Sequence, residues 1–563
     1  MEHNNNALWI ILQKLRTPLL VIIVTYSIAI LGMVLIPGVD DNGKVYHLSF
    51  FDAFYFVSYM ASTIGFGEAP YTFTYTQRLW VAVCIYITVV GWFYGIGALV
   101  SAVTDKTLKF EIMKNSFRKK VKEISNDFVI ILGYTYVNAE IIKRFHSVNI
   151  ETVLIDKDED KINHFLLEES SRDVPVMIGN ALLGETLQDA GITRPNCKAI
   201  VSLFNNEEKN LRIAILTKFL NSKVKVVAKS TLKDITVSIL DTDIAKALNP
   251  FEIFAKRVDI ALKSPHVLVL ENWIYQNSDL MNKAMFLPKG KYIVCGYGRF
   301  GKALQEKFEK HRLDYVFIDE KRIASHEMIE SRKFIRANPD DRDVLLSAGI
   351  EDAVGLIVGT KNDIANLSII ITAKKLNPNI YLIARENTMQ EISIFRAAKI
   401  DWVFMIEKIL INKISLALSK PLKYRFLKLI LKKDEVWAET LVKLLRRSIG
   451  VNPIITALRI NEEESYAIYN ELLVGHEIRV DVLLHSLSNW KKNNSIVPLL
   501  IQRKNEEILL PRNRKLQIGD NILFACDKKA KDEIELIASN IYELYYALYG
   551  QEKESPILKK IFG

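Results

Sequence analysis

The stretch SYMASTIGFGEAP, residues 58–70, places two glycines, a threonine and a carboxylate between two long apolar segments. Thr17 through Val39 is 23 residues without a charged side chain, and Leu79 through Thr104 is 26 residues without one. About 20 apolar residues are enough to cross a bilayer core of ~30 Å. Each segment therefore predicts a membrane-spanning helix.

The residues between these spans have the features of a re-entrant helix followed by an open loop. Ser49-x-x-Asp52 resembles a capping box and predicts a helix from about Ser49 to Ser62, which is too short to cross a bilayer. Non-helical backbone persists at membrane depth only where protein buries it or where it lines water. Glycines at 65 and 67 let successive carbonyl oxygens face one axis, and four such loops would replace the water around a dehydrated cation. The predicted ion filter consists of Thr63, Ile64, Gly65, Phe66 and Gly67.

Charged residues predict the orientation in the membrane. Lys14 and Arg16 precede the first span, a basic run at 106–122 follows the second, and residues 40–77 contain Lys44 as their single lysine or arginine. We therefore expect a multi-pass protein of the cell membrane with both termini in the cytoplasm. The basic run is expected to be a solvated linker, with contact to anionic lipid as the alternative. The net charge of +10 then needs no nucleic-acid partner.

The soluble part is large and carries no cysteine framework. A chain of 563 residues predicts three or four domains of about 150 residues each. The 4 cysteines are scattered, which argues against disulfides and zinc clusters and suits a reducing cytosol.

The chain from residue 128 onward repeats. FVIILGYTYVNAEIIKRFHSVNIETVLIDKDED (128–160) matches YIVCGYGRFGKALQEKFEKHRLDYVFIDEKR (292–322). Gly133 corresponds to Gly296, and Asp156 corresponds to Asp319, each 163 positions further on. The shared order is apolar strand, glycine turn, helix, and a strand that ends in a carboxylate. This order predicts two doubly wound parallel sheets of the Rossmann type.

The second copy has the complete signature of a dinucleotide crevice. Gly296-x-Gly298-x-x-Gly301 lies between a strand and a helix, and Asp319 follows 18 residues later, near the spacing that reaches a ribose hydroxyl. The first copy has Thr135 and Asn138 at the second and third glycine positions, so its side chains crowd the pyrophosphate approach. An empty crevice on a retained fold is the alternative. The candidate nucleotide-binding residues are Gly296, Gly298, Arg299, Phe300, Gly301, Asp319, Glu320 and Arg385.

Other charged positions give weaker indications. Arg385 lies at a predicted strand end where it would reach a phosphate, and Lys229 is its counterpart in the first copy. The cluster DKDED (156–160) and the pair Glu207–Glu208 have the oxygen ligands that a divalent cation such as Ca²⁺ prefers. A solvated acidic patch at the strand ends is the favoured alternative.

The filter sequence resembles that of a known family. Thr63-Ile64-Gly65-Phe66-Gly67-Glu68 is similar to the T-V-G-Y-G-D filter of potassium channels, and its helix–loop–helix setting matches their pore domain. Phe66 lacks the hydroxyl of the usual tyrosine, and Glu68 replaces aspartate. The resemblance implies K⁺ bound by backbone oxygens of residues 63–66. In that family a glycine on the second span is the gating hinge, which implies Gly95 or, second, Gly91; close helix packing is the alternative.

The two repeats resemble RCK (TrkA-N-like) domains, and 509–527 resembles the strand-rich C-terminal lobe of the same family. Tandem copies on one chain resemble calcium-gated large-conductance channels and bacterial GsuK-type channels. That resemblance implies a homotetramer whose RCK domains form a cytoplasmic gating ring. The expected layout is a pore domain (1–104), a linker (105–126), a first RCK domain with crossover helices (127–290), a second RCK domain with crossover helices (291–450) and a C-terminal α+β lobe (451–563).

The resulting hypothesis is a potassium channel gated by intracellular ligands. The ligands are expected to be an adenine nucleotide (NAD, ADP or ATP) at the second copy and a divalent cation at an unassigned site. One alternative is a membrane-anchored regulator of a separate potassium transporter. A nucleotide-dependent dehydrogenase is a weaker alternative, because no catalytic arrangement accompanies the glycine signature and the filter would be unexplained. We therefore do not expect an enzyme.

Overall fold

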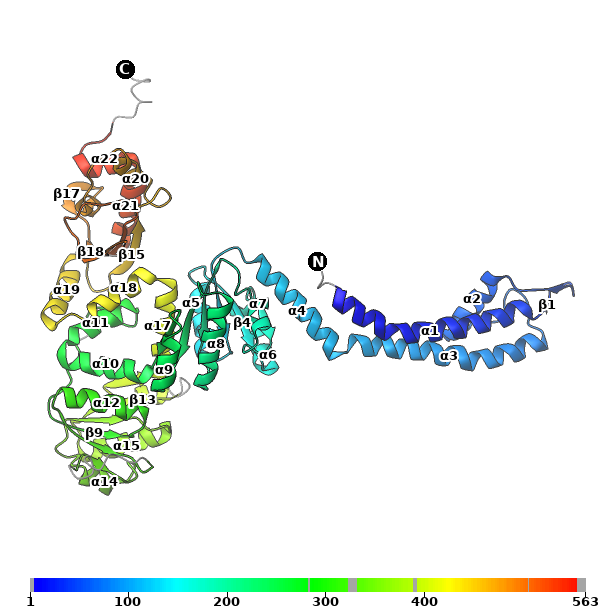
Figure 1. The fold of residues 1–563 in the computed structure, drawn as a ribbon, viewed down its shortest axis with the longest axis horizontal. Coiled ribbons are helices and arrows are strands. Elements are labelled where there is room, and N and C mark those ends of the chain that lie inside the picture. The colour runs from blue at the N-terminus through cyan, green and yellow to red at the C-terminus, as the bar shows by residue number, and fades with distance from the viewer. Residues whose placement is uncertain (1–4, 282–283, 322–331, 388–391, 505, 554–563) are drawn as a thin grey trace, which may run out of the picture. The chain divides into compact units, whose positions relative to one another are not determined.

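The computed structural model describes residues 5–281, 284–321, 332–387, 392–504 and 506–553 (Figure 1). It divides into two compact units. One contains Met1–Ser125, Pro175–Gly179 and Glu185–Gly191, and the other contains the rest of the chain.

The first unit contains two helices that are long and apolar enough to cross a membrane. They belong to α1 (Asn5–Leu35) and α3 (Tyr75–Val103), and the candidate spans within them are Leu15–Leu35 and Tyr75–Ser101. In an 18-residue apolar window of each span, only 22% and 17% of the window is buried inside the structure. A core helix of a water-soluble protein would hide such side chains, so the exposure favours a lipid or subunit environment.

The short helix α2 (Phe50–Ala61) lies between the spans where the sequence predicted it. Ser49 is its N-cap and accepts a hydrogen bond from the backbone N–H of Asp52 at 3.1 Å, and Ser62 is its C-cap. One face of α2 packs into a core with both long helices; its buried members include Ala29, Met33, Ala53, Phe56, Val57, Tyr59, Phe73 and Cys84.

The basic segment after α3 differs from the solvated linker that we expected. It forms α4 (Lys106–Glu123), and Phe117 and Val121 are buried. Arg118 Nε lies 2.7 Å from a carboxylate oxygen of Asp189, and Lys114 Nζ lies 3.5 Å from the other oxygen. Two basic side chains of this helix therefore help to dock it, through their ion pairs with Asp189. Its apolar positions recur at helical spacing, and such a stripe is normally buried against other elements.

The first repeat forms a six-stranded sheet of order β5-β4-β3-β6-β7-β8. Its strands are β3 (Phe128–Leu132), β4 (Glu151–Asp156), β5 (Val176–Ile178), β6 (Cys197–Ser202), β7 (Lys225–Lys229) and β8 (Ala245–Leu248). The pairs β3–β4, β3–β6, β6–β7 and β7–β8 are parallel. Its helices include α5 (Tyr136–His146), α6 (Glu159–Leu166), α7 (Gly184–Asp189), α8 (Glu207–Leu220) and α9 (Lys233–Leu240).

The second repeat has the same topology, with order β11-β10-β9-β12-β13-β14 and parallel pairing throughout. Its strands are β9 (Lys291–Cys295), β10 (Asp314–Ile318), β11 (Phe334–Ile335), β12 (Gly355–Val358), β13 (Tyr381–Glu386) and β14 (Trp402–Met405). Its helices include α12 (Arg299–Lys310), α14 (Arg342–Ser347), α15 (Asp363–Leu376) and α16 (Ile392–Ala397). The chain order of the strands reverses at β9 and β12, which is the predicted Rossmann arrangement.

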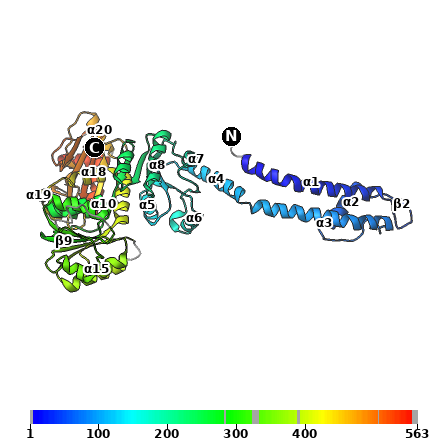
Figure 2. The same cartoon turned by 60° about the horizontal axis from the view of Figure 1, so that its bottom comes forward.

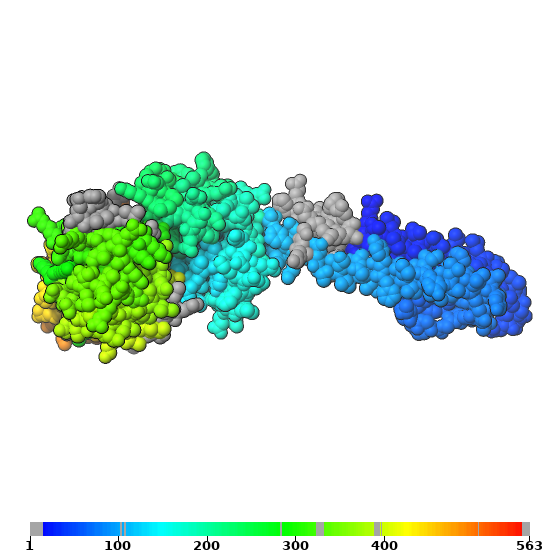
Figure 3. Space-filling model, turned by 90° about the horizontal axis from the view of Figure 1, so that it is seen from below, coloured from blue at the N-terminus to red at the C-terminus, as the bar shows by residue number. Residues whose placement is uncertain are grey.

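Alternate residues of β9 pack into different cores. Tyr292 and Val294 belong to the core beneath α10 (Pro250–Lys263) and α12, whereas Ile293 and Cys295 belong to the core beneath α15. Helices accordingly cover both faces of this sheet, with α10 and α15 on opposite sides of β9 (Figure 2). In the space-filling view this repeat, coloured green to yellow, is one closely packed body (Figure 3).

A pair of helices follows each sheet. The first pair is α10 (Pro250–Lys263) and α11 (Pro265–Ile274), and the second is α17 (Ile406–Ser419) and α18 (Pro421–Ile430), followed by α19 (Glu435–Ser448). Proline begins α10, α11 and α18, where its missing N–H costs nothing.

The C-terminal part is an α+β lobe. Its antiparallel sheet has the order β15-β20-β18-β19. These strands are β15 (Ile454–Arg459), β18 (Ile496–Arg503), β19 (Glu506–Leu509) and β20 (Asn521–Cys526); a hairpin of β16 (His485–Ser486) and β17 (Asn489–Asn493) lies apart. The helices of this lobe include α20 (Tyr466–Leu473), α21 (Lys528–Ser539) and α22 (Ile541–Tyr549).

Candidate functional site

The backbone after α2 alternates between positive and negative φ angles. Thr63, Gly65 and Gly67 have φ angles of 61°, 65° and 101°, whereas Ile64 and Phe66 keep negative φ. A backbone that alternates in this way turns successive carbonyl groups toward the same side, as the filter prediction requires. Threonine at positive φ is uncommon and persists only where neighbouring contacts hold it.

The N–H of Thr63 donates to the carbonyl oxygen of Met60 at 3.1 Å, and Tyr59 on α2 holds the residues that follow. Its carbonyl oxygen accepts hydrogen bonds from the N–H groups of Ile64 at 2.9 Å and Gly65 at 3.4 Å. Its hydroxyl donates to the carbonyl oxygen of Gly67, and its ring meets Phe66 edge-on with centroids 5.5 Å apart. Tyr59 thus offers the hydroxyl that Phe66 lacks, but from the helix side. Sequence reasoning did not select this residue.

Glu68 anchors the outer end of the loop to the start of α3. Its carboxylate accepts two hydrogen bonds from Arg78, at 2.9 and 3.1 Å, and one from the backbone N–H of Phe73 at 2.8 Å. A bidentate arginine–carboxylate pair fixes direction as well as distance. The loop is therefore tied at both ends, by Tyr59 and by Glu68.

The glycines of α3 meet α1 closely. A Cβ at Gly91 would lie 2.9 Å from Oγ1 of Thr25, and a Cβ at Gly95 would lie 2.5 Å from Cδ1 of Ile22. A Cβ at Gly97 would meet nothing within 4 Å. These distances support close packing, the alternative to a hinge, for Gly91 and Gly95. The hinge itself stays a prediction.

The glycine loop of the second repeat has the geometry of a phosphate cradle. A Cβ at Gly301 would lie 2.3 Å from the carbonyl oxygen of Gly296, so only glycine allows α12 to approach β9 this closely. Gly296 itself has φ 108°. At Gly298, the N-cap of α12, a Cβ would meet nothing within 4 Å, and no side chain caps the helix. The N–H groups at this helix end are therefore available to an anion.

A cavity of about 600 Å³ opens at this loop, a size within the ~300–1,000 Å³ of ligand pockets. Its lining comes from the glycine loop, from the ends of β10, β12 and β13, and from the start of α10. The predicted nucleotide residues that it brings together are Gly296, Gly298, Arg299, Phe300, Asp319, Glu320 and Arg385, with Phe251, Gly359 and Thr360 as additions.

Asp319 first of all holds the loop. Its carboxylate oxygens accept hydrogen bonds from the backbone N–H groups of Tyr297 at 2.7 Å and Lys321 at 2.9 Å. Asp156 does the same in the first repeat, where Tyr134 N–H donates to it at 2.6 Å. Because the two repeats share this bond, loop support is a role of the strand-end acid in both copies. Its contact with a ribose stays a prediction for the second copy.

Two arginines give the crevice a positive wall. The Cζ atoms of Arg299 and Arg385 lie 5.6 and 5.2 Å from the ring centroid of Phe251. Burial lowers the pKa of Arg385 to about 10, against the opposing effect of Asp363. Its Nε has no hydrogen-bond partner among the described residues. A phosphate would compensate this buried cation.

Arg299 also reaches the first repeat. Its Nη1 donates to the hydroxyl of Thr231 and lies 3.5 Å from Oε1 of Glu207. Glu207 is buried and accepts hydrogen bonds from the backbone N–H groups of Thr231 at 2.7 Å and Leu232 at 2.9 Å. The first residue of α12 therefore joins the candidate nucleotide crevice of the second repeat to a strand end of the first. Sequence reasoning placed Arg299 in the crevice but missed this second contact.

In the first repeat, side chains fill the loop after β3 that corresponds to the glycine loop of the second repeat. Thr135 caps α5, with the N–H of Asn138 donating to its hydroxyl at 3.3 Å. The Asn138 amide donates to the carbonyl oxygens of Leu132 at 3.2 Å and Gly133 at 2.5 Å. Side chains thus take the places that glycine leaves open in the second copy. Lys229, whose pKa burial lowers, donates to Asn205 at 2.9 Å.

The acidic clusters are occupied by local hydrogen bonds. Asp158 caps α6 and accepts from the N–H groups of Asp160 at 3.1 Å and Lys161 at 3.3 Å. Within the described ranges, no group of three or more His, Cys, Asp or Glu side chains is placed to hold a metal ion. The predicted divalent cation therefore has no assigned residues.

Comparison with known proteins finds the same parts. Residues 129–250 and 292–406 each match the TrkA-N domain family. A potassium channel protein 1 of Methanocaldococcus jannaschii is 41% identical over 97 residues, which are 17% of this chain and 29% of that protein. A Trk system potassium uptake protein TrkA homolog of Pyrococcus horikoshii is 32% identical over 136 residues, which are 23% of this chain and 60% of that protein.

Among solved structures, the GsuK channel is similar over 97% of this chain and 100% of its own, with a TM-score of 0.48 and 12% sequence identity. The matched segment covers less than a third of the curated M. jannaschii channel protein.

Proposed function

We propose that this chain is the subunit of a potassium-selective channel whose opening depends on a nucleotide bound in the crevice of the second TrkA-N domain. The observation that carries the proposal is the loop at residues 63–67, whose backbone alternates in hand between two membrane-length helices and is tied to α2 by Tyr59. Backbone oxygens turned to one side replace a hydration shell without charged side chains, which is how a filter favours K⁺.

The assembly belongs to the same proposal. A single loop supplies one wall of a filter, so four chains around one axis are required to surround the ion. In this arrangement residues 1–104 form the pore, 105–126 connect it to the cytoplasmic part, and 127–290, 291–450 and 451–563 form the first TrkA-N domain, the second TrkA-N domain and the C-terminal lobe. Both termini face the cytoplasm, since the basic residues flank the spans on that side.

Arg299 links the nucleotide crevice to the first TrkA-N domain. It is the first residue of α12, next to the uncapped N-cap at Gly298, and it also contacts Thr231 and Glu207 of the first domain. A nucleotide phosphate at the helix end would compete with those contacts for the guanidinium. Binding would then change the pairing of the two TrkA-N domains, and a ligand moves such an equilibrium by its difference in affinity between the two states.

The test is reconstitution of the purified full-length protein into planar bilayers with K⁺ and Na⁺ on opposite sides. We expect a K⁺-selective current that changes when NAD, ADP or ATP is added on the cytoplasmic side. Gly65→Ala should abolish the current and leave the tetramer intact, because alanine strains the positive φ of 65°. Absence of K⁺-selective current under every nucleotide, from a protein that is tetrameric, would exclude the proposal.

A second candidate is a membrane-anchored regulator of a separate potassium transporter. The similarity to the P. horikoshii TrkA homolog, over 60% of that protein, is the observation that favours it. This candidate predicts nucleotide binding without current from the isolated protein. It also predicts that Gly65→Ala leaves potassium uptake unchanged in cells, whereas the channel proposal predicts loss of the chain's own conductance.

A further inference from the structure

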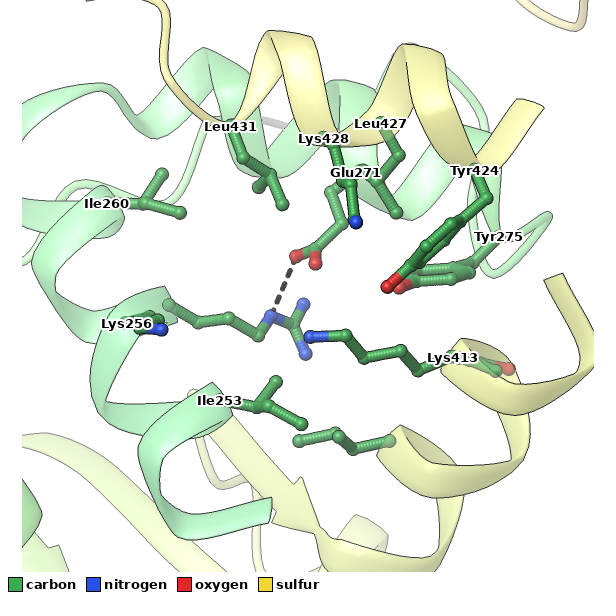
Figure 4. Close-up of a pocket in the computed structure, with 13 residues that line it drawn as sticks. Ile253, Lys256, Ile260, Glu271, Tyr275, Lys413, Tyr424, Leu427, Lys428 and Leu431 are labelled. Carbon is green, nitrogen blue, oxygen red and sulfur yellow. Dashed lines mark ion pairs between the residues drawn. The ribbon is translucent and has the colours of Figure 1, made fainter. Parts of the chain in front are cut away.

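A cavity of about 110 Å³ lies where the helix pair α10–α11 meets the pair α17–α18 (Figure 4). Glu271 points into it from α11 and Lys413 from α17. The polar lining contains four cationic side chains, Lys256, Arg257, Lys413 and Lys428, and one carboxylate, that of Glu271. The cavity therefore holds a clear excess of positive charge in a largely apolar helix junction.

The lining follows from the repeat. Equivalent positions of the two helix pairs lie 156 residues apart, as Pro265 and Pro421 do at the start of α11 and α18. By this register Arg257 corresponds to Lys413, and both line the cavity. Glu271 corresponds to Leu427. The second helix pair therefore has a cation at the position of Arg257 but no carboxylate at the position of Glu271. One carboxylate faces two equivalent cations.

The existing hydrogen bonds leave those cations incompletely satisfied. Nε of Arg257 lies 2.9 Å from Oε2 of Glu271, but neither atom has an aligned hydrogen bond. Nη2 of Arg257 donates to Asn272 at 3.0 Å. Lys413 has no hydrogen bond or ion pair among the described residues. Burial lowers the pKa of Lys413, Glu271 opposes that change, and Lys256 and Lys428 add to it.

Two hydroxyl groups and a further ammonium complete the donor set. Tyr275 and Tyr424 point their hydroxyls at the cavity side by side. Burial raises the pKa of both tyrosines, so both remain protonated donors. Nζ of Lys428 lies 5.0 Å from the ring centroid of Tyr424. Donors thus approach the same space from α10, α17 and α18.

We propose that this cavity is a binding site for a phosphate group, distinct from the nucleotide crevice. A guanidinium fork, ammonium groups and hydroxyl donors are the groups that bind phosphate oxygens, and a dianion would compensate the cations that Glu271 leaves unpaired. The ligand is either inorganic phosphate or the phosphate of a small monoester. In either case it joins the helix pair that follows the first sheet to the pair that follows the second.

The experiment titrates the purified full-length protein with inorganic phosphate and, separately, with glycerol 3-phosphate, by calorimetry at constant ionic strength. All proteins carry Gly298→Asp, which places a carboxylate at the free end of α12 and keeps phosphate out of the nucleotide crevice. We expect Lys413→Met to weaken binding about tenfold or more, and Glu271→Gln to strengthen it, because the amide no longer competes for Arg257. Lys375→Met, at an exposed position of α15, should leave the affinity unchanged.

The opposite signs of the two cavity variants separate a ligand site from a structural cluster. Tighter binding of glycerol 3-phosphate identifies a monoester as the ligand, and tighter binding of inorganic phosphate identifies the free ion; either result supports the site. Binding that is equal in Lys413→Met and Lys375→Met, or absent with both probes, overturns it. Thermal melting of each variant verifies folding, and Lys413→Met should melt no lower than its parent, since it removes a buried unpaired charge.

Discussion

The hydroxyl of Tyr59 donates a hydrogen bond to the carbonyl oxygen of Gly67, eight residues further along the chain. The bond spans the whole candidate filter and fixes its outer end to α2. Because the same residue's carbonyl accepts the N–H groups of Ile64 and Gly65, Tyr59 holds both the inner and the outer part of the loop. The width of the filter should therefore depend on this one side chain.

We expect Tyr59→Phe to reduce the K⁺ over Na⁺ permeability ratio about fivefold, the equivalent of one neutral hydrogen bond of ~1 kcal/mol. Reversal potentials of the reconstituted protein in opposed K⁺ and Na⁺ solutions measure the ratio. Tyr55→Phe is the matched control, since Tyr55 lies on the same helix and is exposed. An unchanged ratio in Tyr59→Phe would show that the filter keeps its shape without the hydroxyl.

Gly298→Asp and Gly301→Ala should impair nucleotide binding in different ways. At Gly298 there is room for a side chain, and aspartate is a good N-cap, so this variant should keep its melting temperature and lose nucleotide affinity by charge repulsion. At Gly301 a Cβ would lie 2.3 Å from the carbonyl oxygen of Gly296, so alanine should lower the melting temperature as well.

Calorimetric titration with NAD and with ADP measures the affinities, and thermal melting measures the stability. Gly184→Ala is a control for a glycine whose Cβ would also meet nothing within 4 Å, in the first repeat. If Gly298→Asp keeps full nucleotide affinity, the ligand does not bind at the end of α12.

Local patterns in the sequence were sufficient to predict the helices, strands and loops that form the candidate filter and the candidate nucleotide crevice. The Ser49 cap, the glycines at 65 and 67 and the loop Gly296–Gly301 each act within a few residues, so their spacing alone predicts the backbone. Asp319 shows the limit of such a pattern. Its position was predicted, but its bonds to Tyr297 and Lys321 give it a supporting role that the nucleotide signature does not include.

The contacts that sequence reasoning missed depend on folding back over longer distances. Tyr59 lies inside the helix that the sequence predicts from Ser49 to Ser62, and only the return of the loop brings Gly67 to its hydroxyl. Arg299 and Glu207 are 92 residues apart, and no periodicity relates them. For the cavity of Arg257 and Lys413 the repeat itself was the available signal, because the two residues hold equivalent positions of the two helix pairs and both line the cavity.

Freeing Arg299 should raise nucleotide affinity. Thr231→Val removes the hydroxyl that accepts from Arg299 and leaves the crevice lining intact. If a phosphate competes with Thr231 and Glu207 for the guanidinium, the variant should bind ADP more tightly, by about tenfold or more, because one hydrogen bond to a charged group contributes about 1.5–3 kcal/mol. Thr242→Val, whose hydroxyl donates within its own turn, is the control. Weaker ADP binding in Thr231→Val would mean that the contact supports the crevice rather than competing with it.

Packing and hinge roles of Gly95 can be separated by a rescue experiment. Gly95→Ala should impair assembly and gating, because a Cβ there would lie 2.5 Å from Cδ1 of Ile22. Ile22→Ala removes that atom, so the double variant should assemble normally. If Gly95 acts only in packing, the double variant also recovers wild-type open probability in bilayer recordings. If gating stays impaired while the tetramer is restored, the glycine is required for bending, since alanine stiffens a helix interior by about 1 kcal/mol. Gly97→Ala, which meets no neighbour, should change neither property under the packing interpretation.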